Sequence, residues 1–144
     1  MPAAPHPFDP SAPATSAWLP AAVLHHATGP TAHHDLLLAT QLPAGPDDPV
    51  CATWRVTEDP RSLAPGQVAE AVPLSPHRAL YLQLDTSRTL DRGRGTVTPV
   101  DAGRWRHAGA GTVEVAWNGG VATTYALDAA TAPSHPPRLR RIDP

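Results

Sequence analysis

Short apolar segments, separated by turns rich in Gly, Pro and Asp, follow one another along most of the chain. Many of them alternate apolar and polar positions or are rich in β-branched residues, a pattern that predicts strands. The predicted strands lie at 21–26, 33–40, 50–57, 77–85, 95–100, 103–107, 111–117 and 121–127. The Asn-Gly-Gly turn at 118–120 predicts a hairpin between the last two. With about eight short strands and almost no helix, we expect an all-β fold, a small antiparallel β-barrel, because closure removes exposed strand edges.

Both ends of the chain are rich in proline. Six of the 19 prolines fall in the first twenty residues, and a segment so rich in Pro and Ala favours neither a helix nor a strand ladder. We therefore expect residues 1–17 to be a disordered or loosely attached tail. Residues 129–144, which carry further prolines and the basic run "RLRR", are expected to be a second tail. Residues 18–128 between them are expected to form the single barrel domain.

Composition excludes several kinds of chemistry. All eleven basic residues are arginine, so neither a P-loop nor a Schiff-base mechanism is available, since both need a lysine. Cys51 is the only cysteine, which rules out an internal disulfide and a multi-cysteine zinc site. We expect a monomer in a reducing cytoplasm, with no secretory signal and no membrane span.

The eight histidines give the first candidate chemistry. In the predicted strand that reads "HHDLLL", side chains alternate between two faces, so His33 and Asp35 project together with Leu37. Imidazole and carboxylate on one face are suitable ligands for manganese, zinc or a similar ion. The preceding strand ends in His25 and His26, and a tight turn would bring one of the two alongside as a third ligand. Which of the two does so is left open by the sequence.

A second set of polar residues accompanies this pair. His77 and Tyr81 share the face opposite the leucines of the predicted strand 77–85, where they can contact a phosphate or transfer a proton. Arg55 lies on the strand 50–57, and Arg92 and Arg94 lie in a Gly-rich loop. Guanidinium groups bind phosphate well, so these three are the candidate phosphate-binding residues.

The remaining histidines receive no functional role. His6 and His135 lie in the predicted tails. We expect His107, at the end of a predicted strand, to lie at the surface.

These motifs, in this order, resemble the 3′-phosphoesterase domain found at the N-terminus of bacterial multifunctional DNA ligase D and in stand-alone proteins. The resemblance covers residues 21–127. It rests on His33 and Asp35, Trp54, His77 with Tyr81, Gly95-Thr96-Val97, and Asp101-Gly103-Trp105.

The resemblance implies a β-barrel that binds a divalent metal, typically manganese, and trims the 3′ ends of DNA or RNA-tipped DNA, alone or with a repair ligase or polymerase. It implies that His26, His33 and Asp35 hold the metal. It also implies that His77 contacts the scissile phosphate, with Tyr81 supporting it.

One departure from the family pattern leaves more than one function open. Catalytic members carry an arginine two residues after the aspartate, where this chain has Leu37. A metal-dependent 3′-phosphoesterase is therefore the leading hypothesis, and a non-catalytic barrel that binds metal or nucleic acid is the alternative. The net charge of −2 also allows a phosphoesterase with a small-molecule substrate.

Overall fold

The structure, a computed structural model, describes residues 4–120 and 122–142. The strands are β1 (Leu19–Ala27), β2 (Ala32–Ala39), β3 (Cys51–Val56), β4 (Val68–His77), β5 (Arg88–Thr89), β6 (Thr96–Gly109), β7 (Thr112–Trp117), β8 (Ala122–Asp128) and β9 (Arg138–Arg141). Two single-turn 3-10 helices interrupt them, η1 (Pro60–Ser62) and η2 (Ala79–Leu82). Neither of the helices in this described part is long and apolar enough to cross a membrane.

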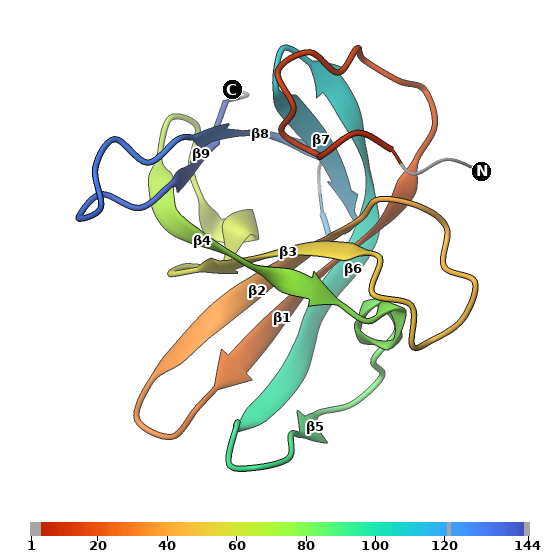
Figure 1. Cartoon of the computed structure of the whole chain (residues 1–144), viewed down its shortest axis with the longest axis vertical. Coiled ribbons are helices and arrows are strands. Elements are labelled where there is room, and N and C mark those ends of the chain that lie inside the picture. Colours follow the sequence, from red (N-terminus) through yellow and green to blue (C-terminus); the bar gives the residue numbers. More distant parts are fainter. Residues whose placement is uncertain (1–3, 121, 143–144) are drawn as a thin grey trace.

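Eight of the strands close into an antiparallel barrel, as the sequence predicts (Figure 1). The order is β1-β2-β3-β4-β9-β8-β7-β6, and β6 pairs back onto β1. The short β5 adds to the other edge of β6 below the barrel in this view (Figure 1). The predicted hairpin at 118–120 joins β7 to β8.

The long strand β6 closes the barrel because it pairs with β1 along one edge and with β7 along the other. Its pairing with β1 shifts register between Val23 and Leu24, and such a bulge bends a strand and increases its twist. Farther along, a Cβ atom added at Gly103 would overlap the carbonyl oxygen of Ala116 on β7. Gly103 therefore allows the close approach of the two strands at this bend.

Two apolar clusters lie on opposite faces of the β1–β2 hairpin. The interior cluster fills the barrel and contains Leu36 and Leu38 with the buried Trp54, Trp105 and Tyr125. The outer cluster packs under η2 and contains Ala22, Leu24, Leu37, Ala39, Val50, Cys51, Ala79 and Leu82. Leu36 and Leu38 thus point inward and Leu37 outward, which confirms the predicted alternation of β2.

The predicted strand 77–85 is wrong. The strand is β4, which ends at His77, and the chain then turns into η2. The backbone N–H groups of Ala79 and Leu80 donate to the carbonyl oxygens of Asp48 and Pro46, so the loop before β3 takes up the hydrogen bonds that a sheet partner would need.

Both segments expected to be loose tails contact the barrel. Phe8 is buried against the edge of Trp54, with 5.2 Å between ring centroids, and belongs to the interior cluster. The N–H of Thr15 donates to the carbonyl oxygen of His107. At the other end, β9 is one of the eight barrel strands and buries Leu139. Residues 4–17 therefore pack on the barrel, and 138–141 belong to it, where the sequence predicted a disordered or loosely attached N-terminal tail and a C-terminal tail.

His107 is also not at the surface. It is 4% exposed and packs edge-on against Trp105, with 4.9 Å between ring centroids. The N-terminal segment covers this end of β6, which the sequence pattern around His107 does not reveal.

Candidate functional site

The turn at 28–31 brings two candidate metal ligands together. The N–H of Thr28 donates to the carbonyl oxygen of Thr31 across the turn, and Gly29 supplies its positive φ of 81°. This turn fixes the β1–β2 register so that His26 lies directly opposite His33, with 4.8 Å between ring centroids. Of the two alternatives, His26 is therefore the histidine on the face of Asp35, and His25 is on the other face.

Asp35 is the centre of the cluster. Its Oδ1 lies 3.2 Å from Nε2 of His33 and its Oδ2 lies 3.6 Å from Nδ1 of His26. One ligand atom from each of the three residues lies within 4.8 Å of the others, an arrangement that can hold a metal ion. The carboxylate is almost fully buried, with 2% of the side chain exposed.

Two atoms of this cluster fit a metal better than a hydrogen-bonded network. Nε2 of His33 and Oδ1 of Asp35 are both buried, and neither has a hydrogen-bond partner of good geometry among the described residues. Burying polar atoms without partners is costly, so such atoms call for a ligand that satisfies them. A divalent ion bound by imidazole and carboxylate would do so.

The protonation state of His33 favours the same role. Burial lowers its pKa, and the charges of Arg55 and His26 add to this effect, while Asp35 opposes it. A neutral imidazole is the form that binds metals. His33 is therefore ready to act as a ligand at neutral pH.

His26 is oriented by a contact from the opposite side. Its Nε2–H donates to the carbonyl oxygen of Arg94, 2.7 Å away. Metal-binding histidines usually donate their second N–H to such an acceptor, which fixes the tautomer and the ring orientation. Nδ1 of His26 is thereby left with its lone pair directed toward Asp35.

The cluster opens into a hollow of about 320 Å³ that is lined by several predicted site residues. His77 and Tyr81 both line it, with 5.8 Å between ring centroids, although they come from β4 and η2 rather than from one strand. Arg55 and Arg94 line it as well. Arg55 lies directly opposite Asp35 in the β2–β3 pairing.

Not every predicted residue belongs to the hollow, and others were missed. Arg92 is not among the described residues that line it. Arg78 lines it without having been predicted, and its guanidinium carbon lies 5.8 Å from the centre of the Tyr81 ring. The guanidinium carbon of Arg88 on β5 lies 5.9 Å from the centre of the same ring. No sequence signal marks either contact, because both depend on how η2 packs against the sheet.

Leu37 occupies the position where the family pattern has an arginine. Its side chain is fully buried in the outer cluster, beside Leu24 and Leu82. The strand therefore contributes no cation at this position, and the nearest arginine on a neighbouring strand is Arg55, across from Asp35.

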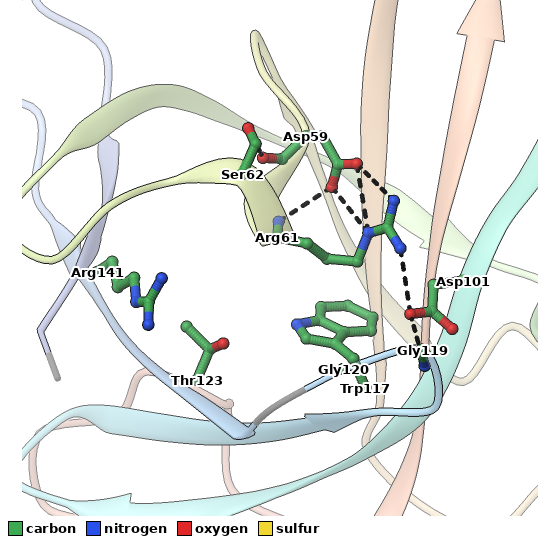
Figure 2. A pocket seen from close by; sticks show the side chains of 9 residues that line it. All are labelled: Asp59, Arg61, Ser62, Asp101, Trp117, Gly119, Gly120, Thr123 and Arg141. Carbon is green, nitrogen blue, oxygen red and sulfur yellow. Dashed lines mark hydrogen bonds and ion pairs between the residues drawn. The ribbon is translucent and has the colours of Figure 1, made fainter. Parts of the chain in front are cut away.

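A second hollow lies beside the β7–β8 turn and has a different character (Figure 2). Arg61 donates to the carboxylates of Asp59 and Asp101, and the N–H of Gly119 also donates to Asp101 (Figure 2). Asp59 accepts from the N–H of Arg61 as the cap of η1. These charges satisfy one another, so this group joins η1, β6 and the β7–β8 turn.

The motif Asp101-Gly103-Trp105 is thus structural in this chain. Asp101 binds Arg61 and the turn, Gly103 allows close strand approach, and the indole N–H of Trp105 donates to the carbonyl oxygen of Ala39 in the core.

The other two histidines of the β1–β2 hairpin form a pair of their own, apart from the candidate metal cluster. His25 and His34 face each other on the side away from Asp35, with 5.3 Å between ring centroids. Burial lowers the pKa of His34, and its Nδ1 is buried without a hydrogen-bond partner among the described residues.

Neither a scan against protein-family models nor a search of curated proteins finds a match to this chain.

Proposed function

We propose that this protein is a metal-dependent phosphoesterase that acts on the 3′ ends of DNA or RNA-tipped DNA. The observation that carries the proposal is the His26–His33–Asp35 cluster, which opens into a hollow lined by arginines. The ligand set suits manganese, and also zinc or similar ions. When bound, such an ion polarises phosphoryl oxygens and lowers the pKa of a bound water.

The residues around the cluster are suited to binding and orienting a phosphate. Arg55 and Arg94 line the hollow, and guanidinium groups form charge-assisted hydrogen bonds with phosphate oxygens. His77 also lines the hollow, and Tyr81 packs against its ring. The resemblance to the ligase D phosphoesterase domain supports the same roles, and the expected setting is cytoplasmic DNA repair with a ligase or polymerase.

The experiment is to incubate the full chain and Mn²⁺ with a 3′-phosphorylated primer–template and to measure the phosphate released. We expect turnover by the unmodified protein and by His25→Ala, and background release by His33→Ala. His25→Ala is the matched control because it removes the neighbouring histidine on the other face. Equal release at background by the unmodified protein and His33→Ala would refute the phosphoesterase.

A non-catalytic barrel that binds metal or nucleic acid is the second candidate, and the burial of Leu37 favours it. Without an arginine at this position, the site lacks the cation that the catalytic pattern supplies from the ligand strand. This candidate predicts that the protein binds Mn²⁺ and 3′-phosphorylated DNA with measurable affinity but releases no phosphate.

A further inference from the structure

The imidazole of His77 faces the candidate metal cluster. Its Nε2 lies 3.9 Å from Oδ2 of Asp35, the same oxygen that faces His26 at 3.6 Å. Bonds of about 2.1 Å in a tetrahedral arrangement place ligand atoms about 3.4 Å apart. This nitrogen lies about 0.5 Å farther from Oδ2 than that spacing. Among the described residues, the ligand atoms within 4.8 Å of one another come from His26, His33 and Asp35, so the imidazole of His77 has to move toward the ion to complete the set.

The other nitrogen of His77 is held as it is in a metal ligand. Nδ1–H donates to the carbonyl oxygen of Ser75, 3.1 Å away. His26 is held in the same way by the carbonyl oxygen of Arg94. Each of these two hydrogen bonds to a backbone carbonyl oxygen fixes the tautomer in which the other ring nitrogen is free and faces Asp35. Such a hydrogen bond from the second ring nitrogen is characteristic of metal-binding histidines.

His77 is also the most exposed member of the group. Its side chain is 27% exposed, against 15% for His26, 11% for His33 and 2% for Asp35. It lies at the rim of the hollow, where an incoming anion arrives first. A ligand in this position can be exchanged without disturbing the three buried ones.

We propose that His77 is a fourth metal ligand through Nε2, and that a phosphate entering the hollow displaces it from the ion. The inference rests on the metal site of the proposed function and extends it, because it gives His77 a place in the resting site. The set of three imidazoles and one carboxylate suits a first-row divalent ion. Leu37 is compatible with this arrangement because it brings no cation toward the ion.

The test counts imidazole ligands directly. In the full chain loaded with Co²⁺, each bound histidine gives one exchangeable, paramagnetically shifted N–H signal in the proton NMR spectrum. We expect three signals from the unmodified protein and from Tyr81→Phe, and two from His77→Ala. We also expect His77→Ala to weaken Co²⁺ binding by at least about tenfold. Two signals in the unmodified protein would overturn the assignment without reference to any variant.

Inorganic phosphate tests the displacement. Saturating phosphate should reduce the three signals of the unmodified protein to two, and an unchanged count would overturn the exchange. None of these measurements needs turnover, so three signals without phosphate release would leave His77 as a ligand and refute the phosphoesterase. Failure to bind Co²⁺ at all would overturn the shared metal site.

Discussion

The carbonyl oxygen of Arg94 accepts the Nε2–H of His26 across 2.7 Å and so connects the β5–β6 loop to the candidate metal site. The two residues are 68 positions apart in the chain. The contact decides which nitrogen of His26 carries the proton, and therefore which nitrogen faces Asp35. The ligand set on the β1–β2 hairpin thus depends on the position of a distant loop.

Substitution of Gly95 tests this dependence. Gly95 follows Arg94, has a φ of +89°, and an added Cβ would overlap the carbonyl oxygen of Ala27. Gly95→Ala should therefore move the loop and weaken metal binding by about 10–100-fold, as loss of an orienting contact usually does. Competition with a chromophoric chelator measures the affinity.

Gly93→Ala is the matched control. Gly93 also has a positive φ, of 67°, but an added Cβ would meet nothing within 4 Å. This variant carries the backbone strain of a non-glycine residue without the collision, so we expect near-normal metal affinity. An equal loss of affinity in both variants would show that strain in the loop, and not the position of the Arg94 carbonyl, determines binding.

Restoring the family arginine at Leu37 should destabilise the protein. The side chain is fully buried between η2 and the sheet, so Leu37→Arg places a charge in an apolar cluster without a buried partner. We expect the free energy of unfolding to fall by about 3–5 kcal/mol, the usual cost of an uncompensated buried charge. Urea unfolding followed by tryptophan fluorescence measures the change.

The control at this position keeps the volume and removes the charge. Leu37→Met should cost less than about 1.5 kcal/mol, because a flexible apolar side chain repacks easily. If Leu37→Arg were instead as stable as the unmodified protein and released more phosphate, the guanidinium would have found a route into the hollow, and the account of the outer cluster would be wrong.

The juxtaposition of His33 and Asp35, the candidate ligand pair, could be predicted from the sequence because it depends only on the two-residue repeat of a strand. Local turn chemistry likewise indicates the hairpins. The secondary structure around His77 and Tyr81, which come from β4 and η2, could not be predicted in this way. Alternating leucines predicted a strand there, whereas the loop carbonyl oxygens of Pro46 and Asp48 convert the segment into η2.

The packing of the two chain ends on the barrel could not be predicted for a related reason. β9 has a single buried apolar residue, Leu139, and forms because barrel closure requires a strand between β4 and β8. Phe8 is one aromatic residue in a proline-rich segment, and its burial depends on Trp54, which is distant in the sequence. Local composition carries no information about such contacts.

Truncation of Phe8 tests whether the N-terminal segment is part of the folded domain. Phe8 is 8% exposed and packs into the interior cluster. Phe8→Ala should lower the free energy of unfolding by about 3 kcal/mol, and Phe8→Leu by clearly less, because it leaves a smaller cavity. Urea unfolding measures both. A change below about 0.5 kcal/mol for Phe8→Ala would show that the segment contributes no packing in solution.

His6 makes the attachment of the same segment sensitive to pH. Its Nδ1 accepts the N–H of Phe8, and its ring packs edge-on against Trp54. Burial lowers its pKa below the usual 6.5, with Asp9 opposing and His107 adding to the effect. A proton therefore binds His6 more weakly in the folded than in the unfolded state, and stability present above about pH 6.5 is lost as the pH falls through the lowered pKa.

We expect urea unfolding to give a lower free energy of unfolding at about pH 5 than at about pH 7.5, within the range where histidines titrate. His6→Gln should show a smaller difference, since the amide oxygen can accept the N–H of Phe8 but does not titrate. His135→Gln, at an exposed histidine between β8 and β9, is the matched control and should behave as the unmodified protein does. An equal loss of stability on acidification in all three proteins would show that His6 does not titrate against the barrel.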